Sequence, residues 1–380
     1  MKTPEYYAAI GYEDHGYVAP ELSTLDEYPE YLRLEVEESA EAIRKNQTPG
    51  SVTFGFMTDL HYARSLNHTV RMRRNRNAWG DLASRVSIEF LLMGGDYTNE
   101  GCREYKTDCF RRLRAWWQDV EYYPANGNHD DGSIWEESYT QTNGEDDLLS
   151  HRDLFSLFYD HLPEKGIAVG PETLYYYFDD PARKIRYVIL DTSEAPGIRD
   201  EAGHLKYRAQ HYYGMSQKQL DWLCKEALVF PDEGWGAVVM GHSCLRHAAS
   251  VPEGEGRLWE TMRPLDFILR ARAAGGAAHR IFSWNEVRYE VSADFTSGPK
   301  GEILAFLAGD HHVDDLETDG PFPVILTANS VPYYVGGPEK VPRRDGDKTE
   351  LLFDVMTLDR AAREIRIVRV GAGEDRLVRY

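Results

Sequence analysis

The sequence predicts an α/β protein built around a parallel β-sheet. After residue 50, short apolar runs typical of buried strands alternate with stretches of helical periodicity, which is the pattern of βαβ units. The chain has 380 residues, of which 42% are hydrophobic and 28% are charged. This length and composition are those of a folded protein with a sizeable core.

Residues 1–50 are expected to form an acidic N-terminal extension with one helix. Thr24 and Glu27 have the spacing of a capping box. Apolar residues then recur at helical intervals, namely Tyr28, Leu32, Val36, Ala40 and Ile43. The sequence Gln47-Thr48-Pro49-Gly50 ends this pattern. We expect the helix to cover an edge of a main domain formed by residues 51–380, with partner binding as the alternative.

Strands and helices alternate along the rest of the chain. The predicted strands are residues 52–58, 88–93, 122–125, 174–178, 185–190, 236–240, 303–307, 324–327, 351–358 and 364–370. The predicted helices are residues 68–84, 102–118, 216–229 and 257–273. Asp179-Asp180-Pro181-Ala182 is typical of a hairpin turn, a second hairpin is expected at the last two strands, and residues 274–300 are expected to form a loop or hairpin.

Charge and cysteine content restrict the partners and the location. Basic residues number 43 and acidic residues 63, and the resulting net charge of −20 disfavours extended nucleic acid as a partner. A metal ion can still invert the local field for a small phosphoester substrate. Four cysteines without a CxxC pair are expected to be reduced. No signal peptide or membrane span is recognisable, so we predict a cytoplasmic protein without a membrane partner and make no prediction of its oligomeric state.

The strongest functional signal is the set of residues that follow five of the predicted strands. These segments are Asp59-Leu60-His61, Gly94-Gly95-Asp96, Asn126-Gly127-Asn128-His129-Asp130, Gly241-His242 and Ala308-Gly309-Asp310-His311-His312. In open α/β sheets, ligands bind at the carboxyl ends of strands. Oxygen and imidazole donors that converge there can hold a pair of divalent metal ions, and the glycines allow tight turns. One such segment is more often a simple turn, but five in one chain favour a binding site.

In this order, the motifs resemble those of the calcineurin-like metallophosphoesterase superfamily, whose pattern is D-x-H, G-D-x-x, G-N-H-[DE], G-H and G-H-x-H. The resemblance spans residues 52–328 and implies a four-layer α/β/β/α sandwich of two mixed sheets. Two positions depart from the family. Asn99 stands where the protein-phosphatase branch has Asp, which disfavours that branch. Asp310 stands where the family has the first His of its last motif.

The resemblance also implies a role for each matched residue. One divalent ion would be held by Asp59, His61, Asp96 and His312, and a second by Asp96, Asn128 and His242, with Asp310 at the departing position. Two dications that share a carboxylate lie about 3.5–4 Å apart and lower the pKa of a shared water towards neutrality. The resulting hydroxide would attack phosphorus while His129 assists the leaving group. Asp96, Asn128 and His129 are therefore the expected catalytic residues. Asp130 would orient His129 or a ligand, or would only cap a turn.

Asp310 leaves three alternatives open. It could bind the second ion directly, and three anionic ligands would then favour manganese or iron over zinc, which stays possible. A small shift of the loop could instead bring His311 to that ion. The second site could also be weak or empty. We favour direct binding.

The sequence says less about substrate recognition. Asn128 and His129 are expected to contact the substrate, and Arg64 could clamp its phosphate, although arginines in this stretch more often lie on a solvated helix face. His204 and His211, in the polar loop 197–214, and His247 are further candidates. No phosphate-binding glycine-rich loop and no G-x-S-x-G motif is present, which disfavours nucleotide-dependent transfer and serine hydrolysis.

These observations predict a metal-dependent phosphoester hydrolase. A phosphodiester substrate is preferred because the stretch from Gly95 to Gly101 looks more like the diesterase-type branches of the superfamily than like the protein phosphatases. Two alternatives stay open. The first is a phosphomonoesterase on the same dinuclear centre, and the second is a metal-poor, non-catalytic scaffold that binds a partner.

Overall fold

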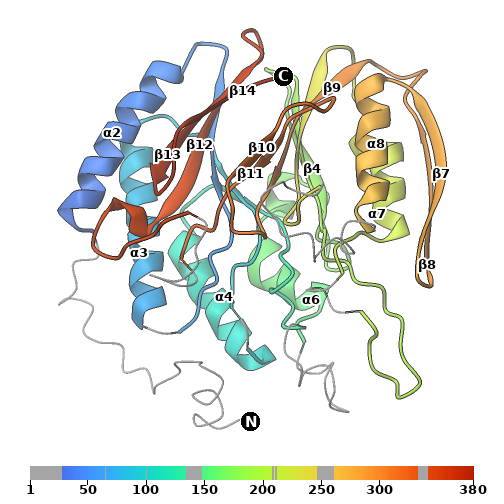
Figure 1. Cartoon of the computed structure of the whole chain (residues 1–380), viewed down its shortest axis with the longest axis horizontal. Coiled ribbons are helices and arrows are strands. Elements are labelled where there is room, and N and C mark those ends of the chain that lie inside the picture. The colour runs from blue at the N-terminus through green and yellow to red at the C-terminus, as the bar shows by residue number, and fades with distance from the viewer. Residues whose placement is uncertain are drawn as a thin grey trace.

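Two mixed six-stranded sheets form the centre of the computed structural model (Figure 1). The structure describes residues 28–380 apart from 65, 100, 134–147, 208, 210–211, 246–260 and 333–340. The first sheet has the order β14 (Arg376–Arg379), β13 (Glu364–Gly371), β12 (Leu352–Asp359), β1 (Val52–Met57), β2 (Leu91–Met93), β3 (Tyr122–Pro124). The second has the order β10 (Asp315–Glu317), β11 (Val324–Leu326), β9 (Gly301–Ala308), β6 (Trp235–Met240), β5 (Ile185–Ile189), β4 (Tyr176–Asp180).

Parallel pairing at the middle of each sheet aligns the strand ends that matter for function. In the first sheet β1, β2 and β3 run parallel to one another. In the second sheet β5, β6, β9 and β11 do the same. Antiparallel strands complete the sheets, with β12, β13 and β14 beside β1, and β4 and β10 at the edges of the second sheet.

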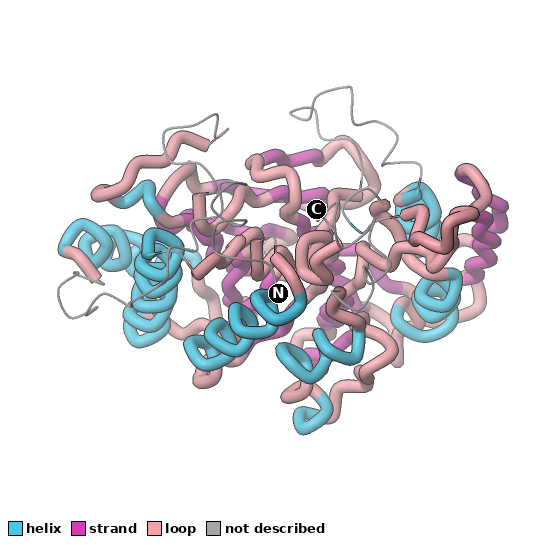
Figure 2. The backbone as a smooth tube through the Cα atoms, turned by 90° about the horizontal axis from the view of Figure 1, so that it is seen from below, coloured by secondary structure: helices cyan, strands magenta, loops and turns pink. Residues whose placement is uncertain are grey.

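Helices cover the outer sides of the two sheets. On the first sheet these are α2 (Glu30–Asn46), α3 (Leu66–Arg85) and α4 (Arg103–Trp117). On the second they are α7 (Gln217–Trp222), which continues as a π-helical turn Leu223–Ala227, and α8 (Arg263–Ala274), with the hairpin β7 (Ala277–Trp284) and β8 (Val287–Asp294) outside them. Seen from below, helices lie on the outside and loops gather over the middle (Figure 2). This arrangement confirms the predicted four-layer sandwich of two mixed sheets.

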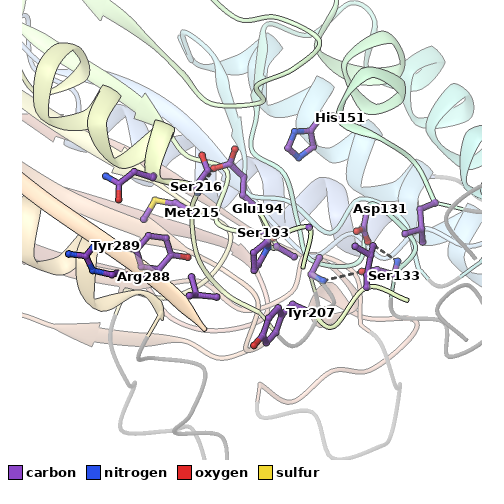
Figure 3. A pocket seen from close by; sticks show the side chains of 18 residues that line it. Asp131, Ser133, His151, Ser193, Glu194, Tyr207, Met215, Ser216, Arg288 and Tyr289 are labelled. Carbon is purple, nitrogen blue, oxygen red and sulfur yellow. Dashed lines mark hydrogen bonds between the residues drawn. The ribbon is translucent and has the colours of Figure 1, made fainter. Parts of the chain in front are cut away.

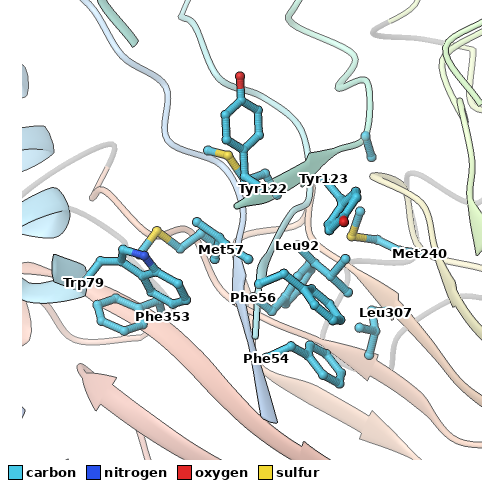
Figure 4. Close-up of a cluster of buried hydrophobic side chains, with 14 of the residues drawn as sticks. Phe54, Phe56, Met57, Trp79, Leu92, Tyr122, Tyr123, Met240, Leu307 and Phe353 are labelled. Carbon is cyan, nitrogen blue, oxygen red and sulfur yellow. The ribbon is translucent and has the colours of Figure 1, made fainter. Parts of the chain in front are cut away.

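The core between the sheets is built by alternation along the strands. On β6, Val238 and Met240 belong to the cluster between the two sheets, whereas Ala237 and Val239 belong to the cluster under α7 and α8. Aromatic rings fill the space between the sheets, and the Phe54 and Tyr187 ring centroids lie 5.6 Å apart. Figure 4 shows Phe54 and Phe56 among the buried side chains of this core. Strands buried on both faces explain why the sequence shows them as continuous apolar runs.

The predicted N-terminal helix forms as α2. It begins at Glu30 after Pro29 and buries the apolar residues that the periodicity selected, namely Leu32, Val36, Ala40 and Ile43. Residues 1–27, with the proposed cap Thr24, lie outside the described residues. The helix packs on β13 and α3 and shares their core. The division of the chain into an extension, residues 1–50, and a domain, residues 51–380, stays a prediction.

Most other predicted elements form with small shifts of their bounds, and antiparallel pairs form at both predicted hairpins and within residues 274–300. Residues 257–260 of the predicted helix 257–273 lie outside the described residues. The short edge strands β10 and β14 were not predicted from the sequence, and neither was the helical region that begins with α6 (His151–Leu154). This region continues as a π-helical turn Phe155–Tyr159 and ends with the 3-10 turn Pro163–Lys165. The 3-10 turn Lys348–Glu350 was not predicted either. Such short elements have too few residues for a periodic pattern. Among the described helices, none combines the length and apolar character needed to cross a bilayer.

Candidate metal centre

The carboxyl ends of five strands bring the predicted metal ligands into one cluster. Asp59 and His61 follow β1, Asp96 follows β2, Asn128 follows β3, His242 follows β6, and Asp310 and His312 follow β9. Three overlapping groups have donor atoms that all lie within 4.8 Å of one another, namely Asp59–His61–His312, Asp59–Asp96–His242 and His61–Asp96–His129. Donors from both sheets therefore meet at one place.

The first donor group lies between the ends of β1 and β9. His312 Nε2 lies 3.2 Å from Asp59 Oδ1, and His61 Nε2 lies 2.9 Å from His312 Nε2. Asp59 is fully buried, and its Oδ1 atom accepts no hydrogen bond from the described residues. A buried carboxylate oxygen without a donor is costly unless a cation satisfies it. Two imidazoles and a carboxylate that point at one another fit a divalent metal ion.

The second donor group surrounds His242. Its Nε2 atom lies 3.2 Å from Asp96 Oδ2, 3.0 Å from Asn128 Oδ1 and 3.6 Å from Asp310 Oδ1. Nδ1 lies 2.8 Å from the Gly94 carbonyl oxygen, which can only accept, so Nδ1 carries a proton and Nε2 faces the oxygens. With its amide oriented to satisfy its partners, the Asn128 nitrogen donates to both Asp96 carboxylate oxygens at 3.1 Å. The Asp96 and Asp310 carboxylate oxygens that face His242 Nε2 fit a cation between them.

Asp96 belongs to both groups. Its Oδ2 atom lies 3.6 Å from His61 Nε2 and 3.2 Å from His242 Nε2. Burial alone would raise the pKa of Asp96, but His242 and His129 outweigh burial and lower it. Burial would lower the pKa of His242, yet Asp96 and Asp59 raise it well above its usual value. The site thus has an excess of negative charge that protons or metal cations can neutralise.

Left-handed backbone directs five of these side chains inward. The φ angles are 55° at Asp59, 42° at His61, 53° at Asp96, 69° at Asp310 and 53° at His312. Residues other than glycine rarely adopt this region, and each instance costs on the order of 1–3 kcal/mol. Backbone hydrogen bonds hold the conformation, for example from the Asp59 amide to the Gly95 carbonyl at 3.0 Å.

Two glycines of the motifs are required by close approach. A Cβ atom on Gly127 would collide with the backbone nitrogen and carboxylate of Asp96. A Cβ atom on Gly309 would collide with the Asp59 carboxylate and the Thr58 hydroxyl. Backbone in direct contact with the candidate ligands explains why glycine stands beside them.

Asp130 acts on the backbone rather than on His129. Its carboxylate accepts hydrogen bonds from the amides of Gly127, Asp96 and Tyr97 at 2.9, 3.1 and 2.9 Å. It therefore joins the loop after β3 to the loop after β2. Of the two roles that the sequence left open, the structure favours the capping of a turn.

Lys106 and Tyr213 are site residues that sequence reasoning missed. Lys106, buried on α4, donates from Nζ to Thr98 Oγ1, the Asn99 carbonyl and the His129 carbonyl at 2.7, 2.7 and 2.6 Å. A lysine on an amphipathic helix normally lies on the exposed face, so the sequence around Lys106 does not indicate this buried role. Tyr213 donates to Asp310 Oδ1 at 3.1 Å. From the sequence, only the position of Tyr213 in the polar loop 197–214 could have indicated that it lies at the site.

The geometry favours Asp310 over His311 as the residue that faces the second group. Asp310 is almost fully buried, and its Oδ1 atom points towards both Tyr213 and His242. Its amide donates to Asp59 Oδ2 at 3.1 Å, which links the two donor groups. The His311 ring packs edge-on against Tyr213, and its Nε2 atom lies 3.3 Å from Asp310 Oδ2. His311 is thus a neighbour of the Asp310 carboxylate.

The predicted substrate contacts differ in their surroundings. The Arg64 guanidinium pairs with Asp108 at 3.1 Å and lies 4.6 Å from the centre of the Tyr105 ring, so a substrate role for Arg64 stays a prediction. His204 lies 3.6 Å from Asp200 in an exposed turn. His211 and His247 lie outside the described residues.

A cavity of about 530 Å³ lies between the loops that follow β3 and β5 and the start of β8 (Figure 3). The loop 197–214 contributes to its lining, together with Asp131, which follows His129 by two positions, and Ser193. On the β5 side, Asn126 donates to Asp191 at 3.2 Å, which joins the loop after β3 to the loop after β5. None of the residues that line the cavity is a candidate ligand of the metal centre, and its volume gives room for a small molecule.

Comparisons with known proteins give the chain a family. Solved structures similar to it include phosphopantetheinyl hydrolase from Mycobacterium tuberculosis (12% identity, TM-score 0.38, 78% of this chain and 100% of that chain). They also include GAP50, the anchor in the inner membrane complex of Plasmodium (11% identity, TM-score 0.40, 87% of this chain and 90% of that chain). A third is a purple acid phosphatase from yellow lupin seeds (12% identity, TM-score 0.38, 88% of this chain and 54% of that chain). No curated protein matches the chain significantly. The family model for calcineurin-like phosphoesterases matches residues 52–271, more than half of the sequence. The chain therefore belongs to the calcineurin-like phosphoesterase family.

Proposed function

We propose that the chain hydrolyses a phosphoester at a dinuclear metal centre, with a phosphodiester as its preferred substrate. The observation that carries this proposal is the position of Asp96, whose Oδ2 atom faces His61 on one side and His242 on the other at 3.6 and 3.2 Å. One carboxylate shared by two sets of donors is what a pair of divalent ions requires. Membership of the phosphoesterase family supports the same reaction class.

The proposed ligands follow the two donor groups. One ion would be held by Asp59, His61, Asp96 and His312, and the other by Asp96, Asn128, His242 and Asp310. The fit is supported by Asp59 Oδ1 and Asp310 Oδ2, buried carboxylate oxygens that accept no hydrogen bond from the described residues. Three carboxylates in the combined set favour manganese or iron, with zinc as the alternative.

When bound, two divalent ions polarise the phosphoryl oxygens and lower the pKa of a shared water. Asn128 lies between Asp96 and His242 and is placed to contact a phosphoryl oxygen. His129 is 14% exposed, more than Asp96 or His242, and its Nε2 atom lies 3.8 Å from Asp96 Oδ2. Its place at the solvent side of the ligands suits donation of a proton to the leaving oxygen.

The charge of the donor set supports a diester substrate. With Asp310 in place of the neutral histidine of the family pattern, three carboxylates oppose the charge of the two ions. The loaded centre thus carries one positive charge less than it would with histidine. A dianionic monoester loses more attraction from this change than a monoanionic diester does. The preference predicted from the stretch Gly95 to Gly101 is therefore also favoured electrostatically.

A comparison of an aryl diester with an aryl monoester tests this proposal. With protein purified without chelator and supplied with manganese, we expect turnover of the diester to exceed that of the monoester by about 10-fold or more, corresponding to about 1.4 kcal/mol in activation free energy. Dominant monoester turnover would show that the substrate class is wrong. Asp96→Asn, which removes the shared carboxylate charge, is expected to abolish turnover of both esters.

Elemental analysis separates catalysis from the scaffold alternative. We expect at least two equivalents of divalent metal per chain. A chain that retains no metal after purification and takes up none from manganese would favour a scaffold that binds a partner.

A further inference from the structure

A second group of metal-binding side chains lies outside the centre. Donor atoms of His151, Asp191 and Glu194 all lie within 4.8 Å of one another. His151 is the first residue of α6, whereas Asp191 and Glu194 follow β5. None of the three belongs to a motif that the sequence analysis assigned to the centre.

Asp191 is the most buried member of this group. Its Oδ1 atom accepts hydrogen bonds from Asn126 Nδ2 at 3.2 Å and from the Ser193 amide at 3.0 Å. Its Oδ2 atom accepts no hydrogen bond from the described residues and faces His151 Nε2 at 3.3 Å. The same feature, a buried carboxylate oxygen without a donor beside an imidazole, marks Asp59 in the main centre.

Glu194 places a second carboxylate beside Asp191. Its Oε2 atom accepts from the Ser216 amide at 2.7 Å and from Gln219 Nε2 at 2.6 Å, which fixes the side chain. Burial and the nearby Asp191 raise the pKa of Glu194. Within the described part of the chain, no lysine or arginine forms an ion pair with either carboxylate.

The cavity described above gives this group room for a ligand. His151, Glu194 and Ser193 line it, and Figure 3 shows the three side chains around the same space. The Ser193 side chain is 5% exposed, and its hydroxyl forms no hydrogen bond within the described residues. Asp131 adds a further carboxylate to the lining. An unsatisfied hydroxyl and excess negative charge at one wall indicate a cation with water molecules as additional ligands.

We propose that His151, Asp191 and Glu194 bind a divalent cation at the wall of this cavity. One imidazole and two carboxylates are donors that suit manganese, iron or zinc. The hydrogen bond from Asn126 to Asp191 connects this cation site to Asn128 two residues further along. The site itself depends only on the three side chains and their surroundings, so it stands independently of the proposed hydrolysis.

Metal counting in matched variants tests the site. After incubation with Mn²⁺ and gel filtration, His151→Ala and Glu194→Gln are each expected to hold one equivalent of manganese per chain less than the parent. His204→Ala, which removes another partly exposed histidine of this region, is expected to hold as much manganese as the parent. An unchanged count in both site variants would overturn the proposal.

A separate control tests whether the variants still fold. The His151 side chain is 34% exposed, so its removal is expected to leave the far-UV circular dichroism spectrum unchanged. Should Glu194→Gln unfold, anomalous scattering from manganese-soaked crystals of the parent gives the second readout, with a peak within ligand distance of all three side chains expected. Absence of that peak, with manganese present at the main centre, would contradict the site.

The outcomes also separate this inference from the proposed function. Asp96→Asn is expected to lose turnover and to keep the equivalent of manganese that His151→Ala removes. A parent protein without turnover, in which His151→Ala still loses one equivalent, would overturn the hydrolase proposal alone. If the parent hydrolyses the ester but His151→Ala and His204→Ala hold the same number of manganese equivalents per chain, the cation site alone is overturned.

Discussion

Asp310 is the residue at which this chain departs most from its family, and its surroundings make the departure testable. Asp310→His is expected to shift the balance of bound metal from manganese towards zinc by about 10-fold, because an imidazole is a softer and neutral donor. The measurement is elemental analysis after dialysis against equal concentrations of both metals, together with the diester-to-monoester turnover ratio, which is expected to fall.

The neighbouring histidine supplies the control for this prediction. His311→Ala is expected to keep the manganese-to-zinc balance of the parent, because Asp310 lies between His311 and His242, with its carboxylate oxygens 3.3 and 3.6 Å from their Nε2 atoms. If metal content and turnover are the same in Asp310→His as in the parent, Asp310 does not bind the second ion. If His311→Ala loses metal instead, His311 is the ligand.

The candidate ligands were accessible from the sequence, whereas their supports were not. Asp59, Asp96 and His242 stand in short motifs directly after strands, so their convergence follows from local patterns and sheet geometry. Lys106 contacts the loops of the site through tertiary packing, and nothing in its local sequence distinguishes it from a surface residue. Asp191 directly follows the predicted strand 185–190, but no motif of the family pattern surrounds it. Roles that depend on distant partners require the fold to be known first.

At the level of elements, α4 holds the loops after β2 and β3 through Lys106. Lys106→Met is expected to lower the free energy of unfolding by about 3–5 kcal/mol, because a buried ammonium group and three hydrogen bonds are lost together. Its turnover is expected to fall as well, since His129 loses the contact that fixes its backbone. Urea unfolding followed by circular dichroism measures the first effect.

Lys225→Met provides the matched substitution for Lys106→Met. Lys225 is exposed on the π-helical turn after α7, where it pairs with Asp221 at 2.7 Å. Its replacement is expected to leave the urea midpoint close to that of the parent. Equal midpoints for the two variants would show that the buried position of Lys106 does not stabilise the fold.

Element prediction succeeded where periodicity extended over several turns or where strands were continuously apolar. α2, α3 and α4 were found because apolar residues recur over four or more turns. β10 and β14 were missed because three or four residues with mixed polarity become strands only when a partner strand is present. Their formation depends on β11 and β13 rather than on their own sequence.

At the scale of the whole molecule, a buried ionic network ties the first sheet to the loop after β11. Asp354 on β12 pairs with Arg369 and Arg376 and accepts from Thr327, while Arg369 also pairs with Asp314. Burial would raise the pKa of Asp354, but the two arginines outweigh burial and lower it. Such a network is sensitive to acid because its carboxylate has to stay ionised.

The network predicts a specific loss of stability at low pH. Because the pKa of Asp354 is lower in the folded than in the unfolded protein, its contribution is complete above the unfolded value of about 3.9 and declines as the pH falls below it. Asp354→Asn is therefore expected to cost about 3–5 kcal/mol at pH 7 and progressively less below pH 4. Urea titrations of parent and variant at pH 7, 5 and 3.5 measure the difference. A constant difference across these pH values would contradict the assignment.

The overall architecture was predictable only in part from local patterns. Alternating strands and helices indicate a parallel sheet, but they do not show that β4, β5, β6 and β9 form a second sheet opposite the first. That division came from the resemblance to a family, because pairing between distant strands leaves no local signature. The order of motifs along the chain therefore contained more information on the architecture than composition or periodicity did.

The place of β1 between β2 and β12 has a consequence for biosynthesis. Val52 on β1 pairs with Leu358 on β12, so one side of β1 has no partner strand until the ribosome has added about 300 further residues. At about 5–20 residues per second, the nascent chain presents that unpaired apolar edge for roughly 15–60 seconds. Chaperones that bind extended apolar segments during translation are therefore expected to matter more for this polypeptide than for one whose neighbouring strands emerge in succession.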